Sequence, residues 1–237
     1  MSIPAAYLTV ILIWSTTPLA IKWSAQGAGF GFAVAARMAI GLAVALLILA
    51  LWRIDLPLHR RARMSYLVSG LSLFGAMTLT YWGSQYIHSG LVSVLFGLAP
   101  LMTGLMALFW LKEESFSPAK FAGMLLGLAG LALIFGDSGE MGGAHAVAGV
   151  AALLAAVGIY SSGLVWIKRI GDDSPPLATT AGSLAVSLPL FALVWWLSDG
   201  HAPAEVPVRA GIAIVYLGVF GSVLGLDRKS TRLNSSH

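Results

Sequence analysis

The stretch MSYLVSGLSLFGAMTLTYWGSQYIHSGLVSVLFGLAPLMTGLMALFWL, residues 64–111, contains no Asp, Glu, Lys or Arg. A helix needs about 20 mostly apolar residues to cross the hydrocarbon core of a bilayer, which is about 30 Å thick. The stretch is therefore long enough for two crossings, and a polar break at His88-Ser89-Gly90 divides it. It predicts two membrane-spanning helices joined by a short loop.

Further stretches without a charged side chain follow one another along the chain. They cover residues 1–21, 38–52, 121–136, 141–167, 174–198 and 210–226. Only 10% of the 237 residues are charged and 58% are hydrophobic, whereas about a quarter of the residues of an ordinary soluble domain are charged. This composition excludes a disordered chain, a nucleic-acid-binding module and a conventional soluble enzyme. We therefore expect an all-α integral membrane protein with eight spans, at approximately residues 4–22, 32–52, 66–87, 90–111, 119–136, 147–167, 177–197 and 210–226.

The basic residues mark one side of the predicted membrane. When the loops are numbered from the N-terminus, one side receives Arg53, Arg60, Arg61, Arg63, Lys112, Lys120, Lys168 and Arg169. The other side receives only Lys22 and Arg209. Short loops rich in Lys and Arg stay in the cytoplasm. The N-terminus is therefore expected inside, in a multi-pass protein of the cell (inner) membrane.

The sequence also repeats itself weakly after 146 residues. The shift places Ile21-Lys22 on Ile167-Lys168, Pro57 on Pro203, Arg63 on Arg209, and Phe74-Gly75 on Phe220-Gly221. Matches of Leu and Ala are common in membrane helices, but these matches at one offset indicate a duplication. Because the first repeat holds five spans, an odd number, the second must begin on the opposite side of the membrane. Inverted repeats are typical of secondary transporters, whose site lies near the midplane between the two halves.

The duplication predicts the domain organisation. Residues 1–146 form a first repeat of five transmembrane helices, and residues 147–226 form a second, incomplete repeat of three. Partners for the fourth and fifth spans do not follow. Residues 227–237 are a polar tail that we expect to be artefactual. We therefore expect the chain to be a truncated product that folds poorly and does not transport.

Three segments resemble a known family over residues 1–226. They are IWSTTPLAIK at residues 13–22, Ala99-Pro100 followed by LKEESFSPAKFAG at residues 111–123, and YLGVFGSVLG at residues 216–225. Together they are similar to the EamA-like branch of the drug/metabolite transporter superfamily, although Glu113 stands where members commonly have Gly. The resemblance implies ten spans in two inverted five-helix repeats. It also implies the export or exchange of small metabolites such as amino acids, driven by gradients rather than ATP.

The first predicted span holds the most informative cluster of polar residues. Pro18 has no N–H, so the carbonyl of Trp14 loses its helical partner and the helix is expected to bend there. Ser15, Thr16 and Thr17 add hydroxyls at about the same depth. Irregular backbone at this depth is tolerated only against protein or a water-filled cavity. The cluster therefore predicts either a structural kink or the wall of a substrate pocket.

Other predicted spans carry related features. The repeat places Tyr160-Ser161 on Trp14-Ser15. In the fourth span, Pro100 frees the carbonyl of Phe96. The third span has a polar and aromatic face, for which core packing is an equal alternative. The substrate-pocket candidates are therefore Trp14, Ser15, Thr17, Pro18, Tyr81, Trp82, Gln85, Phe96, Pro100, Tyr160 and Ser161.

Two charged residues have predicted roles. An arginine inside the membrane is costly unless it reaches water or a partner. Arg37 lies within the second span and is expected either to reach outward to the headgroups or to contact an anionic group of the substrate. Glu114 is expected to pair with Lys120 or Lys112 as a structural latch in a cytoplasmic loop.

Two pairs of glycines have the spacing that lets membrane helices approach each other closely. They are Gly123 with Gly127, and Gly221 with Gly225. We expect this packing to occur inside one chain, and a homodimer stays an alternative.

No enzyme motif stands out in the sequence, and its scattered histidines and lack of cysteine offer no metal site. No Asp or Glu lies inside a predicted span, so the chain offers no proton relay of the usual kind. We therefore expect no catalytic residue, no cofactor and no nucleic-acid partner. The sequence favours a secondary transporter or exporter of small, amino-acid-like metabolites that works by alternating access in the lipid bilayer. The alternative is a non-transporting membrane scaffold or sensor module.

Overall fold

The computed structural model describes residues 3–112, 118–136, 144–198, 200–201, 203 and 205–224. Within these ranges the regular structure is helical and no strand occurs. The helices are α1 Ile3–Ala25, α2 Phe30–Trp52, α3 Arg60–Gly83, α4 Ser89–Phe96, α5 Ala99–Leu111, α6 Pro118–Gly136, α7 Ala144–Ile170, α8 Pro176–Ser198 and α9 Val208–Tyr216, followed by the π-helix η1 Leu217–Leu224.

Every predicted span overlaps a helical segment of the structure, although the span predicted at residues 66–87 runs past the end of α3 at Gly83. Helices satisfy their backbone hydrogen bonds internally, which the bilayer core requires. In the described part of the chain, four stretches are long and apolar enough to cross a membrane, namely Phe30–Trp52, Ser89–Leu111, His145–Ile170 and Pro176–Ser198. The fold class is thus all-α integral membrane, as predicted. Two of the predicted spans are not uniform α-helices, because one is divided into α4 and α5 and another continues from α9 into η1.

The chain forms two compact units. The first contains α1, α2, the beginning of α3, α8, α9 and η1, and the second contains the end of α3 with α4, α5, α6 and α7. The chain passes from one unit to the other between Phe74 and Gly75, inside α3, and again between Gly171 and Asp172, just after α7. Each unit has its own core.

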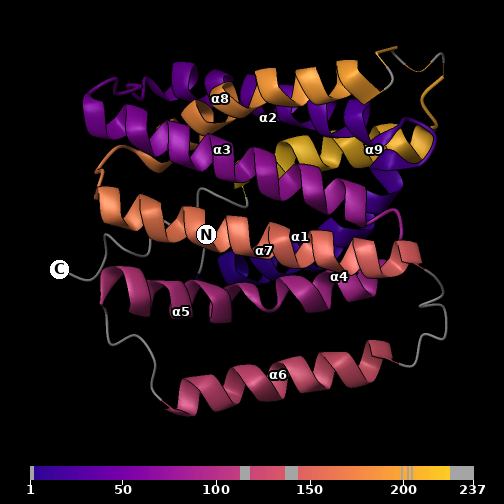
Figure 1. Ribbon diagram of the computed structural model, residues 1–237. Coiled ribbons are helices and arrows are strands. Elements are labelled where there is room, and N and C mark those ends of the chain that lie inside the picture. Colours follow the sequence, from indigo (N-terminus) through magenta and orange to yellow (C-terminus); the bar gives the residue numbers. More distant parts are fainter. Residues whose placement is uncertain are drawn as a thin grey trace. The chain divides into compact units, whose positions relative to one another are not determined.

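The core of the first unit lies between α2 and α8, which run side by side (Figure 1). Ala45 and Leu49 of α2 form a buried cluster with Leu177, Ala178 and Ala181 of α8. Small side chains dominate this cluster, so the two helix backbones come close together, as is usual for membrane helices.

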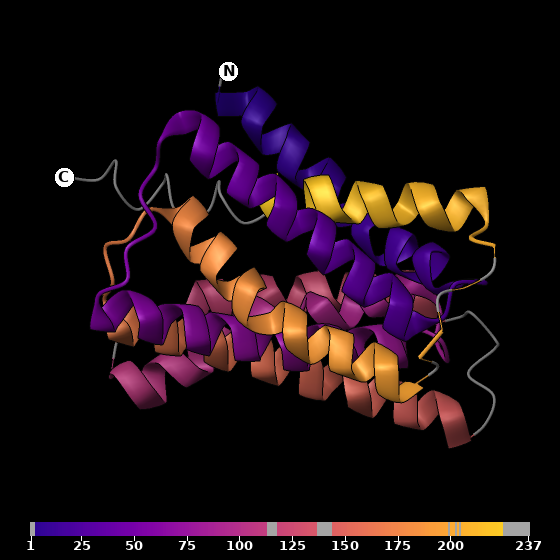
Figure 2. The same cartoon turned by 90° about the horizontal axis from the view of Figure 1, so that it is seen from above.

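Other helices of the first unit pack equally tightly. A Cβ atom added at Gly182 of α8 would lie 2.4 Å from the ring of Tyr66 in α3, and one added at Gly70 of α3 would lie 2.7 Å from Val186 in α8. Glycine is therefore required where α3 crosses α8. Helix α1, in indigo, lies beside α9, in yellow (Figure 2).

The second unit is built around α7. Leu153 of α7 packs with Ile87, Val92 and Leu95 in a buried apolar cluster. Helix α6 lies beside α4. No atom lies within 4 Å of a Cβ atom added at Gly123 or at Gly127 of α6. The predicted close approach at this glycine pair is therefore wrong within the described structure, because no neighbouring helix reaches that face of α6.

Candidate functional site

In the first unit, the polar cluster of α1 faces α9. The hydroxyl oxygen of Thr16 lies 2.6 Å from that of Tyr216, the last residue of α9. Thr16 also donates to the carbonyl of Leu12 at 2.7 Å. A threonine hydroxyl has a single proton to donate. While that proton is used on Leu12, Tyr216 is the donor to Thr16.

The neighbouring hydroxyls bind to the backbone of α1 itself. Ser15 donates to the carbonyl of Leu12 at 3.1 Å, and Thr17 donates to the carbonyl of Ile13 at 2.6 Å. Hydroxyl bonds to the preceding turn support a helix that contains a proline. Helix α1 accordingly continues through Pro18 as one element.

Trp14 projects from α1 without entering the core of the first unit. Its side chain is 44% exposed, whereas buried side chains of the same helix such as Ile13 and Ile21 are at most 6% exposed. Ser15, next to it, is exposed as well. The part of α1 that carries the pocket candidates is therefore an accessible surface of this unit.

Arg37 is buried in the first unit, with an exposed fraction of 5%. A Cβ atom added at Gly221 of η1 would lie 3.3 Å from Nη2 of Arg37, and one added at Gly218 would lie 3.1 Å from its carbonyl oxygen. Two glycines thus allow η1 to lie directly on the arginine. The expectation that Arg37 reaches outward to the headgroups is wrong, because its side chain is enclosed by its own unit. Gly225, the predicted partner of Gly221, lies outside the described residues.

The switch from an α-helix to a π-helix was not predicted from the sequence. It occurs between Tyr216 and Leu217, immediately after the residue that contacts Thr16. The rings of Tyr216 and Phe220 lie 5.5 Å apart, centre to centre, at this switch. Segments of π-helix inside α-helices are frequent at functional sites. The only signal in the sequence is the pair Gly218 and Gly221, which permits unusual backbone packing.

In the second unit, the predicted backbone break at Pro100 divides a span in two. Helix α4 ends at Phe96 and α5 begins at Ala99, with Pro100 in its first turn. The buried hydroxyl of Ser161 in α7 donates to the carbonyl of Ala99 at 3.2 Å. Ser161 therefore braces the beginning of α5. Tyr160, beside it on α7, is half-buried.

The aromatic face predicted on the third span separates into two parts. Tyr81 is fully buried in the second unit. Trp82 meets Tyr86 edge to face, with ring centres 5.0 Å apart, and Tyr86 stacks on His145 at 5.6 Å. Gln85 is exposed, and its amide donates to the carbonyl of Trp82 at 3.4 Å. Tyr86 and His145 extend the predicted face, and sequence reasoning missed them because they lie in a turn and at the start of a helix.

The predicted latch at Glu114 lies outside the described residues. Lys112, which follows α5, is exposed and has a left-handed backbone conformation with a φ of 54°. Across the part of the chain that the structure describes, no three His, Asp or Glu side chains lie close enough together to hold a metal ion.

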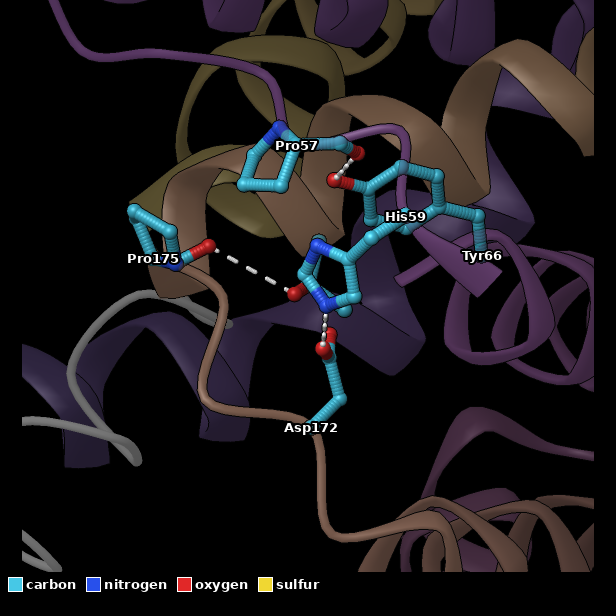
Figure 3. Close-up of polar contacts among 6 residues, drawn as sticks. Pro57, His59, Tyr66, Asp172 and Pro175 are labelled. Carbon is cyan, nitrogen blue, oxygen red and sulfur yellow. Dashed lines mark hydrogen bonds and ion pairs between the residues drawn. The ribbon is translucent and has the colours of Figure 1, made fainter. Parts of the chain in front are cut away.

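Sequence reasoning also missed a polar cluster between two loops (Figure 3). Nε2 of His59 lies 2.9 Å from Oδ1 of Asp172, and the hydroxyl of Tyr66 donates to the carbonyl of Pro57 at 2.9 Å. The side chain of Asp172 is only 3% exposed. The only signal in the sequence is the loop GDDSPP at residues 171–176, because consecutive acidic residues before two prolines indicate a structured turn.

These observations define the class of the protein. It is a polytopic helical membrane protein whose spans carry hydroxyl, aromatic and arginine side chains at breaks and switches of the helices. The sequence pattern of the EamA-like transporter family matches residues 2–136, and the chain belongs to this family.

Relatives of known name agree with this assignment. The chain is 26% identical over 230 residues to a "Probable terminal-alkyne amino-acid exporter" of Streptantibioticus cattleyicolor. The matched region covers 93% of this chain and 72% of that protein. It is 22% identical to Protein PagO of Salmonella typhimurium, over 95% of this chain and 74% of the relative. It is 31% identical to the "Uncharacterized transporter YoaV" of Bacillus subtilis, over 54% of this chain and 44% of the relative.

A solved crystal structure has the same fold. It superposes with a TM-score of 0.71 and 27% sequence identity, covering 95% of this chain and 77% of that one. The family and the named relatives point to a transporter of small molecules rather than an enzyme, with a multi-pass location in a membrane.

Proposed function

We propose that the protein exports small, amino-acid-like metabolites across the cell inner membrane by alternating access, with its N-terminus in the cytoplasm. The family match over residues 2–136 supports the general class, a transporter of small molecules. The substrate class is supported by the name of one relative, an amino-acid exporter. The orientation is supported by the concentration of Lys and Arg in alternate loops.

The observation that carries the mechanism is a correspondence between α2 and α8. A shift of 146 residues, taken from the sequence repeat, carries Phe30 onto Pro176 and Trp52 onto Ser198, which are the two ends of α8. Seven of the nine buried positions of α2 then fall on buried positions of α8. Among them, Met38 falls on Leu184, and both are fully buried.

This correspondence supports a chain made of two repeats, residues 1–146 and 147–226. Boundaries and burial of a helix are set by its packing, so they agree at one offset when two helices occupy equivalent places in a duplicated fold. An odd number of spans in the first repeat makes the two repeats inverted. In many secondary transporters, one repeat moves against the other around a central site. The site then opens in turn to each side of the membrane.

Within this mechanism we assign substrate contacts to residues of both repeats. Trp14 and Tyr160 stand at equivalent positions, each followed by a serine. Trp14 is accessible on its unit, and a Trp N–H or Tyr O–H inside a membrane normally finds a polar partner. Among the basic residues inside the predicted spans, Arg37 lies furthest from a span end, and we assign it the contact with an anionic group of the substrate.

Counterflow in liposomes tests the proposed function. The full-length protein is reconstituted with unlabelled amino acids inside, and uptake of each radiolabelled amino acid is followed against protein-free vesicles. The proposal expects accumulation of at least one labelled amino acid that collapses when the internal pool is omitted. A membrane scaffold or sensor would give the uptake of empty vesicles for every compound, and this result would overturn the proposal.

A further inference from the structure

The second passage of the chain between the two units has an open and unusual backbone. It lies between Gly171 and Asp172, just beyond the end of α7. Gly171 has a φ of +58°, a conformation that side chains disfavour, and a Cβ atom added there would meet nothing within 4 Å. The other passage lies inside the continuous helix α3. Of the two, only the passage at Gly171 can rotate without breaking helical hydrogen bonds.

The residue that follows this glycine is held firmly. The Asp172 side chain is 3% exposed, and Oδ1 lies 2.9 Å from Nε2 of His59, a residue of the loop before α3 that is itself 57% exposed (Figure 3). The loop that carries His59 is fixed in turn. The hydroxyl of Tyr66 donates to the carbonyl of Pro57, and the ring of Tyr66 packs against Gly182 of α8.

The side-chain attachment of Asp172 rests on one of its two carboxylate oxygens. Oδ2 of Asp172 is buried and has no hydrogen-bond partner among the residues that the structure describes. If His59 released Oδ1, the carboxylate would be buried without any protein partner, which is costly. The loop must then move to bring the carboxylate to water. His59 is 57% exposed, so water can replace Asp172 as its partner, whereas the buried carboxylate reaches water only when the loop moves.

We propose that Gly171 is a hinge between the two units and that the His59–Asp172 pair clamps its far side. While His59 holds Asp172, a rotation at Gly171 moves α7 and leaves the residues from Asp172 to the start of α8 in place. When His59 releases Asp172, the loop of residues 171–175 moves together with α7. This inference rests on the proposed transport by alternating access, which requires one part of the protein to move against another.

Pulsed electron paramagnetic resonance between two spin labels tests the hinge. The chain contains no cysteine, so the only labels are those introduced. Leu51→Cys in the first unit and Phe109→Cys in the second are suitable, since their side chains are 70% and 75% exposed. Leu51→Cys with Leu197→Cys, both in the first unit, reports its internal integrity. The variants are Asp172→Asn and His59→Ala, and the matched control is Asp173→Asn, an exposed carboxylate one residue further on.

The proposal expects Asp172→Asn and His59→Ala each to shift or widen the distance distribution between the units, and the double variant to do no more than either alone. The distance inside the first unit should stay unchanged, and Asp173→Asn should match the parent. Gly171→Ala should narrow the distribution between the units, because a side chain restricts the hinge. A distribution for Asp172→Asn that equals that of Asp173→Asn would overturn the proposal, as would an equal change inside the first unit.

These outcomes are separable from failure of the proposed function. The distances are measured without substrate and require no transport. A protein that fails in counterflow but shows the expected changes keeps the hinge and loses the transport function. A protein that transports but shows no change loses the hinge alone.

Discussion

The hydroxyl oxygens of Thr16 and Tyr216 lie 2.6 Å apart and join α1 to α9 across 200 residues of sequence. Tyr216 is the last α-helical residue before the π-helix η1. One hydrogen bond therefore connects the hydroxyl cluster of the first span to the helix switch. A polar contact between membrane helices contributes about 0.6 kcal/mol on average and up to about 2 kcal/mol.

Tyr216→Phe is expected to lower the free energy of unfolding by about 0.5–1.5 kcal/mol, because it removes the donor and leaves the ring in place. Thr16→Val should cost a similar amount. The two substitutions together should cost clearly less than the sum of the two, since each removes the same bond. Thermal unfolding in detergent measures all three variants. Strictly additive costs would show that the two hydroxyls do not depend on each other.

Gly218→Ala is expected to be destabilising by about 1–3 kcal/mol, as is usual when atoms are added to a well-packed interior. The added Cβ would lie 2.7–2.8 Å from the side chain of Ile40 and 3.1 Å from the carbonyl of Arg37. Gly158→Ala in α7 is the matched control, since its Cβ would meet nothing within 4 Å. The control should be neutral or gain up to about 1 kcal/mol of helix stability. Equal melting temperatures for the two variants would contradict the close packing of η1 on α2.

Ser161→Ala should lower stability by about 1 kcal/mol, because its buried hydroxyl bonds the first residue of α5 across helices. Ser162→Ala is a control one residue away, whose hydroxyl donates only to Ile159 in its own helix at 2.8 Å. That variant should lie within about 0.5 kcal/mol of the parent. Chemical unfolding of both variants in the same detergent measures the two losses of stability. A larger loss for Ser162→Ala than for Ser161→Ala would contradict the bracing role of Ser161.

The helices and their order follow from the sequence because charge-free segments of sufficient length have one stable form in a bilayer. The break between Phe96 and Ala99 was also predictable, since Pro100 removes a specific hydrogen bond. The enclosure of Arg37 could not be predicted from the sequence, because it depends on which helix covers that side of α2. The predicted packing at Gly123 failed for the same reason, as glycine spacing permits a close approach without supplying the neighbour.

Contacts between distant loops lie further beyond sequence reasoning. The pair formed by His59 and Asp172 joins residues 113 positions apart, and neither belongs to a recurring motif. Its formation depends on Tyr66 and Gly182, which bring α3 against α8. The predicted roles of the pocket candidates stay predictions, because the structure shows their places in each unit and contains no substrate.

The proposed orientation makes a prediction for labelling in intact cells. Leu58→Cys, in the basic loop before α3, should resist a membrane-impermeant maleimide until the cells are permeabilised, because this loop is placed in the cytoplasm. His201→Cys, in the loop before α9, should react from outside. Both side chains are exposed, so accessibility within the protein does not distinguish them. Strong labelling of Leu58→Cys in intact cells would reverse the orientation.

The central claim is that two equivalent repeats contribute to one transport function, and Trp14 and Tyr160 test it most directly. Transport rate and thermal stability are measured for Trp14→Ala and Tyr160→Ala in the same preparations of the full-length protein. The account predicts that each variant loses most of its transport per folded molecule while unfolding close to the parent temperature. Loss of a buried aromatic ring that serves only packing costs about 3–5 kcal/mol of stability instead. Unchanged transport per folded molecule in either variant would contradict the account.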